Sequence, residues 1–203
     1  MGNKVDYKKE LKELYAASAK ACSVTTVPAM NFLMIDGSGN PNSSIEFQNA
    51  VEALFSVAYT LKFMIKKSVN IDYGVMPLEG LWWCDDMENF SMENKDSWKW
   101  KLMIMQPSHI NREIFCEAVE KVSREKRLAA IDKVSFGTYD EGIVAQVLHV
   151  GPFSEEGPTV EKLHSFISDN KYQINGKHHE IYLSDTRRGK PEKWKTIIRQ
   201  PIK

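Results

Sequence analysis

The chain has 203 residues, 42% of them hydrophobic, and its 27 Lys and Arg residues balance its 27 Asp and Glu residues. This length suits one large domain or two small ones, and the apolar content is ordinary for a globular protein with a sizeable core. The zero net charge and the mixing of both signs along the chain disfavour a nucleic-acid or membrane partner.

The cysteines and the apolar runs indicate the cellular environment in which the chain is expected to fold. Cys22, Cys84 and Cys116 lack metal-site spacing, and the start MGNKVDYKKELKEL lacks the apolar core of a signal peptide. These features predict a reduced, cytoplasmic protein. Runs such as NFLMI and KLMIM are far shorter than the roughly 20 residues that a membrane span needs, so no membrane partner is expected.

The first half of the chain predicts a strand, a helix and two further strands. The charged stretch 6–20 predicts a helix that packs on one side, and AMNFLMID predicts a strand followed by a turn. Apolar residues then step by three and four from Phe47 to Ile65, and Ser43 with Glu46 fits a capping box, so we predict a helix here. VMPLEGLWW and WKWKLMIMQP predict strands, and CDDMENFSMENKDS between them predicts a long hairpin loop.

The second half repeats this order after a connecting helix predicted over residues 111–130. VSFGTYDEG predicts an extended stretch, GIVAQVLHVGPF a strand, and SEEGPTVEKLHSFISDN a helix with Pro158 in its first turn. HHEIYLSD and WKTIIRQP predict the last two strands.

A repeated segment indicates an internal duplication. WKLMIMQP at 100–107 and WKTIIRQP at 194–201 are identical at five of eight positions, and each predicts the final strand of a strand-helix-strand-strand unit. We therefore predict an α+β fold, with residues 1–203 forming a single domain from half one (about 28–107), the connecting helix (about 111–130) and half two (about 142–201). The predicted central antiparallel sheet carries helices on one face and a ligand cleft on the other.

Within HHEIYLSD, strand alternation places Glu180 and Tyr182 on one face, with His179 and Ile181 on the other. We expect the aliphatic face to lie under the helix, which leaves Glu180 and Tyr182 in the cleft as candidate catalytic and ligand-binding residues. A carboxylate in an aromatic, partly dry site has a raised pKa and can orient or deprotonate water near neutral pH. The alternative is that Glu180 is a solvated or salt-bridged strand residue.

Four tryptophans gather in the equivalent hairpin of half one. Trp98 and Trp100 share a face, whereas Trp82 and Trp83 point to opposite faces, so at most one of the latter pair lines the cleft directly. We predict that at least two of the four bind ligand, because planar molecules stack on such rings and cations are attracted to them. The alternative is that they belong to the core, as aromatic strand residues more often do.

Neither a metal nor a cofactor is predicted. His178, His179 and Glu180 resemble metal ligands in sequence, but neighbouring strand residues point in opposite directions and no Cys or Asp completes a zinc set. The glycine-bearing GSGNPNSS lacks the ending of a phosphate loop and predicts a turn with a helix cap.

These stretches together resemble the GyrI-like small-molecule-binding proteins, in particular their stand-alone bacterial branch. The resemblance covers nearly the whole chain after about residue 27. It rests on VPAMNFLMIDGSGNP, VEALFSVAYTLKFMIKK, MPLEGLWW, WKWKLMIMQP, LHVGPFSEEGPTVEKLHSFI, HHEIYLSDTRR and PEKWKTIIRQP. Thr186 departs from the proline expected in relatives, which should affect only a turn.

The resemblance implies an open concave face for flat, lipophilic, often cationic small molecules. In drug-sensing relatives a buried glutamate meets the ligand among aromatic rings, and Glu180 matches that position here. Some stand-alone relatives resemble hydrolases that use an aromatic cage to open the cyclopropane of DNA-alkylating natural products of the yatakemycin and duocarmycin class. The chain has no room for a helix-turn-helix domain, so the transcription-factor role is not carried over.

Three classes of function therefore compete. A detoxifying hydrolase of electrophilic xenobiotics and a protein that only binds or sequesters drugs both need the same cleft. A protein-interaction module would need a surface patch that the sequence does not identify. The expected oligomeric state is a monomer or a homodimer.

Overall fold

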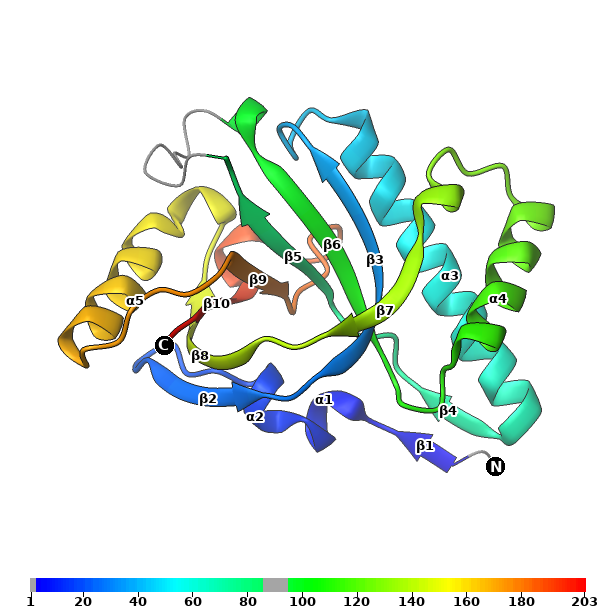
Figure 1. Ribbon diagram of the computed structural model, residues 1–203, viewed down its shortest axis with the longest axis horizontal. Coiled ribbons are helices and arrows are strands. Elements are labelled where there is room, and N and C mark those ends of the chain that lie inside the picture. Colours follow the sequence, from blue (N-terminus) through cyan, green and yellow to red (C-terminus); the bar gives the residue numbers. More distant parts are fainter. Residues whose placement is uncertain (1–2, 86–94) are drawn as a thin grey trace. The chain divides into compact units, whose positions relative to one another are not determined.

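The computed structural model describes residues 3–85 and 95–203, and Figure 1 shows the arrangement of its helices and strands. The chain divides into two compact units. Unit 1 comprises Met1–Tyr7, Met30–Met76 and Trp82–Tyr139, and unit 2 comprises Lys8–Ala29, Pro77–Leu81 and Asp140–Lys203. Each is considered by itself below.

The strands form two sheets. A short parallel pair joins β1 (Asn3–Val5) to β4 (Ile71–Tyr73), and an antiparallel eight-stranded sheet has the order β2-β8-β10-β9-β5-β6-β3-β7. The strands of this sheet are β2 (Ser23–Val27), β3 (Met30–Ser38), β5 (Leu78–Trp83), β6 (Lys99–Gln106), β7 (Ser135–Tyr139), β8 (Gly142–Val150), β9 (His178–Tyr182) and β10 (Lys195–Pro201).

The α-helices are α1 (Tyr7–Glu10), α2 (Lys12–Tyr15), α3 (Ile45–Val69), α4 (Arg112–Glu125) and α5 (Gly157–Asp169). Short 3-10 helices are η2 (Lys95–Ser97), η3 (Ile131–Lys133), η4 (Phe153–Glu155) and η5 (Pro191–Lys193). None of the helices in the described ranges has the length and apolar character that crossing a membrane requires.

The predicted duplication is confirmed at the level of element order and pairing. The first repeat runs β3, α3, β5, β6 and the second runs β8, α5, β9, β10. Within the sheet these repeats have the strand orders β3-β6-β5 and β8-β10-β9, so the last strand of each repeat lies between its other two strands. WKLMIMQP and WKTIIRQP lie in β6 and β10, which are equivalent strands, and the α+β class with an antiparallel sheet is confirmed.

Helix α3 begins one residue later than the predicted capping box implied. The Ser44 hydroxyl accepts a hydrogen bond from the Phe47 backbone N–H at 3.2 Å, so Ser44 rather than Ser43 is the N-cap. The helix ends at Asn70, whose φ of 59° lies in the left-handed region. Its buried face includes Leu54 and Leu61, as the periodicity predicted.

Two parts of the prediction differ from the structure. The stretch 6–20 forms the two short helices α1 and α2 rather than one helix, and Leu14 and Tyr15 are its buried residues. Three short strands were also not predicted: β1 and β4, which pair with each other, and β2, which pairs with β8 in unit 2. Most of the predicted hairpin loop CDDMENFSMENKDS falls on residues 86–94, which lie outside the described residues.

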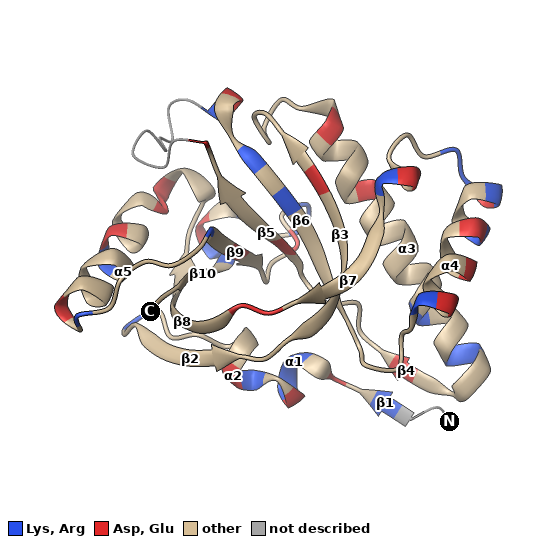
Figure 2. Ribbon diagram, viewed as in Figure 1, with Lys and Arg blue, Asp and Glu red and all other residues tan. Residues whose placement is uncertain are grey.

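Each unit has its own packing between helix and sheet. In unit 2, Leu163 and Ile167 of α5 pack against Ala145, Val147 and Ile198 of the strands. In unit 1, α3 packs on β3 and β6, and the predicted connecting helix α4 packs against α3. Figure 2 shows residues of both charge signs along α4 and α5, as is typical of helices with one exposed face.

Candidate functional site

Strand β9 presents Glu180 on the face of the sheet that α5 covers. Glu180 is paired with Ile198 across the β9–β10 ladder, and paired residues of antiparallel strands share a face. Ile198 in turn belongs to the core that Leu163 and Ile167 of α5 complete. The expectation that the helix covers the Ile181 face is therefore wrong, because the residues that extend the α5 core lie on the Glu180 face.

The Glu180 carboxylate is held at both oxygens. The Tyr182 hydroxyl donates a hydrogen bond to Glu180 Oε2 at 2.7 Å, and His178 Nε2 lies 3.1 Å from Glu180 Oε1. The side chains of His178 and Glu180 are 11% and 14% exposed. The structure thus brings the two predicted catalytic residues, Glu180 and Tyr182, into direct contact and adds His178, which was not predicted as a site residue.

A row of aromatic rings extends from the tyrosine that holds this carboxylate. Phe153 of η4 meets the Tyr182 ring edge-on, with ring centroids 5.5 Å apart, and lies 5.1 Å from the Trp194 ring. Trp194 and Tyr182 are both partly buried. A carboxylate can attract a cation, and a row of rings that begins at its tyrosine partner can offer surface for stacking. Phe153 and Trp194 were missed by the sequence reasoning, although Trp194 is the counterpart of Trp100 in the repeat.

A second histidine approaches the site from α5. Burial lowers the pKa of His164, and electrostatic repulsion from His178 lowers it further.

The opposite face of β9 carries a buried ionic network. His179 Nδ1 lies 2.8 Å from Glu141 and His179 Nε2 lies 3.0 Å from Glu79 of β5. Arg199 of β10 donates to the second oxygen of Glu141 at 3.1 Å, and the Tyr15 hydroxyl donates to the second oxygen of Glu79 at 2.7 Å. We call these five residues the far-face network. It confirms that His178 and His179 point in opposite directions.

The far-face network also holds the N-terminal segment. Arg199 donates to the backbone carbonyl of Leu14, and Gln146 of β8 donates to that of Glu13 at 2.8 Å. Arg199 also donates to the side-chain carbonyl of Gln146 at 3.0 Å. Within unit 2, the short helix α2 is therefore fixed to β8 and β10 by polar groups as well as by the burial of Leu14.

Electrostatics explain how the network tolerates burial. Burial alone lowers the pKa of His179, but Glu141 and Glu79 outweigh it and raise this pKa to about 9. Burial raises the pKa of Glu141, but His179 and Arg199 reverse this and hold it below the usual value. Burial, reinforced by the charge of Glu79, raises the pKa of Tyr15. The Glu141 carboxylate and the His179 imidazolium thus stabilise each other's charged forms in the buried network.

Three of the four predicted tryptophans are buried on the α3 side of unit 1. Phe47 of α3 stacks on Trp82 at 6.0 Å and meets Trp100 edge-on at 5.3 Å, and Trp82 lies 5.5 Å from Trp98. The Trp100 indole also fills the space over Gly37, where a Cβ atom would come within 2.1 Å of it. These rings are therefore not on a helix-free face, because the first turn of α3 covers them.

Trp83 differs from these three rings. It follows Trp82 in β5, so its side chain points to the other face of the strand, and it is partly buried rather than buried. Since both residues lie in β5, Trp82 and Trp83 point to opposite faces, as the sequence predicted. Whether any of the four contacts a ligand stays a prediction.

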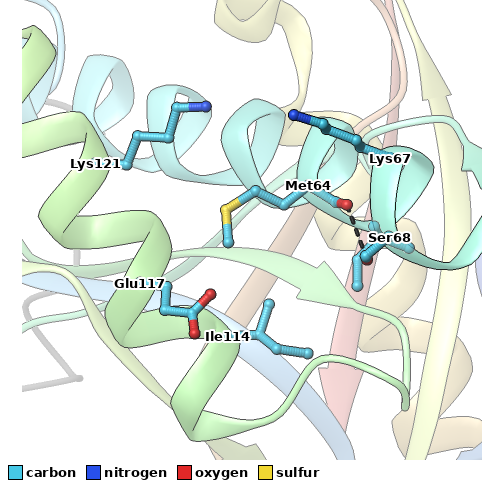
Figure 3. A pocket seen from close by; sticks show the side chains of 7 residues that line it. Met64, Lys67, Ser68, Ile114, Glu117 and Lys121 are labelled. Carbon is cyan, nitrogen blue, oxygen red and sulfur yellow. Dashed lines mark hydrogen bonds between the residues drawn. The ribbon is translucent and has the colours of Figure 1, made fainter.

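A groove between α3 and α4 is a separate surface feature of unit 1. It has a volume of about 620 Å³, and Figure 3 shows Met64 and Ile114 projecting into the space between the two helices. Lys67, Lys121 and Glu117 add charges of both signs. Within residues 3–85 and 95–203, no group of three or more His, Cys, Asp or Glu side chains is arranged to hold a metal ion. We use the name Glu180 patch for Glu180, its partners His178 and Tyr182, and the Phe153 and Trp194 rings. The Glu180 patch is the better candidate for the functional site, because it combines a hydrogen-bonded carboxylate with aromatic rings.

The repeated helix-on-sheet units and the carboxylate beside aromatic rings define a small-molecule-binding fold. The chain belongs to the GyrI-like family, since residues 20–203 match the GyrI-like small molecule binding domain. Comparison with curated protein sequences gave no match.

Three solved structures from Listeria innocua are similar over almost the entire chain. A conserved protein described as uncharacterised is 39% identical, with a TM-score of 0.91, and the match covers 98% of this chain and 100% of that one. Two proteins described as hydrolases are 37% and 38% identical, with TM-scores of 0.88 and 0.85, and the matches cover 99% and 98% of this chain and 100% of each of theirs. The EcmrR C-terminal domain is 11% identical with a TM-score of 0.54, which shows a shared fold alone.

Proposed function

We propose that this protein binds planar, lipophilic molecules, cations included, beside Glu180 and detoxifies electrophilic ones by hydrolysis. Opening of an activated cyclopropane in a DNA-alkylating natural product is the proposed reaction. The observation that carries the proposal is the Glu180 carboxylate, which accepts a hydrogen bond from Tyr182 at 2.7 Å, together with the Phe153 ring that meets Tyr182 and the Trp194 ring that meets Phe153. The rings suit a flat substrate, and the carboxylate suits a water molecule or a cation.

The proposed reaction is a net addition of water. A water oxygen bonds to a cyclopropane carbon while Glu180 accepts a proton from that water. The strained carbon–carbon bond breaks, and its electron pair moves into the conjugated carbonyl group of the substrate, whose oxygen becomes a phenolate. The phenolate takes a proton from solvent, and Glu180 returns its own proton to solvent, so atoms and charge balance.

The comparisons support the coarser part of this proposal. The family is described as small-molecule binding, and two relatives at 37% and 38% identity are described as hydrolases. The substrate class comes from the resemblance noted in the sequence and from the rings beside Glu180.

The alternative is a protein that binds such molecules without turning them over. The family description favours it directly, because it names binding and no reaction. The two functions separate when a cyclopropane-bearing compound of this class is supplied in large excess. A hydrolase consumes all of the compound, whereas a binder removes about one equivalent and then stops.

We further propose that the tryptophans of unit 1 contact ligand. The indole N–H groups of Trp82 and Trp100 are buried and have no hydrogen-bond acceptor among the described residues, and an unsatisfied buried donor is costly. Both rings are 0–3% exposed under the first turn of α3, so a planar ligand with an acceptor group would satisfy these donors only where that turn moves aside. Tryptophan fluorescence should then be quenched by planar compounds, and quenching that persists unchanged when Trp98 and Trp100 are both changed to Ala would remove those two from the site.

A further inference from the structure

His178 is the second donor that holds the Glu180 carboxylate. Its Nε2 atom lies 3.1 Å from Glu180 Oε1, and the Tyr182 hydroxyl holds Oε2 at 2.7 Å. An ionised carboxylate only accepts hydrogen bonds, so His178 must donate from Nε2 when Glu180 is ionised. The two donors lie at positions i−2 and i+2 on the same strand face, one on each side of Glu180.

We propose that His178 is the positioning residue for Glu180 in the hydrolysis proposed above, on which this inference rests. With Tyr182 alone, the carboxylate group can rotate about its last carbon–carbon bond while keeping one hydrogen bond. With His178 on the other oxygen, the plane of the carboxylate is fixed. The orientation of the remaining lone pair on each oxygen is then fixed, so a water molecule can be bound at a defined position.

The surroundings of His178 keep its ring in this position. The residue is in the middle of the sheet, on β9 between β10 and β5, and its side chain is nearly buried. The titratable groups near it are Glu180 and Tyr182 on its own strand and His164 on α5. A side chain that is only 11% exposed has little freedom to lose when it forms a hydrogen bond, which favours its use in orienting a catalytic group.

A double-mutant cycle tests whether His178 acts through Glu180. The variants are His178→Phe, which keeps a ring without a donor, and His178→Gln, which keeps a donor, each alone and combined with Glu180→Gln. Single-turnover hydrolysis of a cyclopropane-bearing compound and binding of a planar compound that lacks the cyclopropane are measured for each. His109→Gln is the matched control, because it changes an imidazole of unit 1 that contacts Tyr7 and Tyr73 rather than the Glu180 carboxylate.

We expect His178→Phe to lower the single-turnover rate roughly 10- to 100-fold, the scale of a misplaced catalytic group, with the binding of the inert compound unchanged. His178→Gln should restore most of the rate, and His109→Gln should keep it. In the Glu180→Gln background, His178→Phe should add no further loss, because residues that act as a unit are not additive.

Two results distinguish failure of this inference from failure of the proposed function. If Glu180→Gln lowers hydrolysis but His178→Phe lowers it by the same factor in both backgrounds, His178 acts independently and the inference is overturned. If Glu180→Gln itself leaves hydrolysis unchanged, the proposed function fails first. A rate for His178→Phe equal to wild type also overturns the positioning role.

Discussion

The two faces of strand β9 carry the same kinds of residue in opposite settings. On the α5 face, Glu180 meets a histidine and a tyrosine and keeps part of its surface exposed. On the far face, His179 meets Glu79 and Glu141, and these three side chains are 0–1% exposed. Accessibility rather than residue type therefore separates a candidate reactive carboxylate from structural ones.

The two faces of β9 should also differ in how much they contribute to the stability of the fold. In the far-face network, both ring nitrogens of His179 and both oxygens of Glu141 and of Glu79 have partners. A buried ionic group is tolerated under this condition, and removal of one member leaves an uncompensated charge. The Glu180 patch is less enclosed, so substitutions in it should affect ligand binding and hydrolysis more than the free energy of unfolding. The predictions below test this difference in order of decreasing effect.

Arg199→Met should be the most damaging change. It leaves Glu141 facing His179 alone and frees the carbonyl of Leu14, so the free energy of unfolding should fall by about 3–5 kcal/mol. Urea unfolding followed by circular dichroism measures this loss. Arg187→Met is the matched control, since Arg187 is exposed, and it should leave the unfolding midpoint unchanged. Equal midpoints for the two variants would mean that the network does not stabilise the fold.

Alkaline pH should weaken the far-face network. The pKa of His179 is raised to about 9 in the folded state, above the ordinary value near 6.5. The stabilisation is therefore complete below about pH 6.5 and is lost as the pH rises through 9, with a size of the order of 3 kcal/mol. His179→Gln should flatten the dependence of unfolding free energy on pH between about 6.5 and 9.5. Parallel curves for wild type and variant would show that His179 is not the titrating group.

Tyr182→Phe should have the smallest effect of the series. The ring that meets Phe153 is kept, and only the hydroxyl that donates to Glu180 is lost. Loss of one of the two hydrogen bonds that fix this charged carboxylate corresponds to a rate of hydrolysis lower by roughly 10-fold, the lower end of the range expected for His178→Phe. Affinity for planar compounds should be retained. A loss as large as that of Glu180→Gln would instead assign a direct chemical role to the hydroxyl.

The repeat explains why much of the fold could be predicted from the sequence. Local signals such as the periodicity from Phe47 to Ile65 and the two WK segments depend on neighbouring residues, and they lie in α3, β6 and β10 as expected. Glu180 and Tyr182 could be placed on the same face for a similar reason, because strand alternation depends only on residues that are near each other in the sequence. The side of the sheet that the helix covers was predicted wrongly, because strand alternation does not identify the covered face.

The far-face network could not be predicted, because its members are distant in the sequence. Tyr15 and Glu79 are 64 positions apart, and His179 and Glu79 are 100 apart. One signal was nevertheless present. Arg199 in WKTIIRQP occupies the position of Met105 in WKLMIMQP, and Met105 is buried in the structure. A charged residue at a buried strand position indicates a buried partner.

Hydrolysis by the Glu180→Gln variant tests the central claim most directly. The substitution keeps the shape of the side chain while removing its charge and its capacity to accept a proton. We predict that single-turnover hydrolysis of a cyclopropane-bearing compound falls by roughly 10²- to 10⁴-fold, while the unfolding midpoint and the affinity for neutral planar compounds are retained. Hydrolysis at the wild-type rate in the variant would contradict the account, and no hydrolysis by the wild type would leave binding alone as the function.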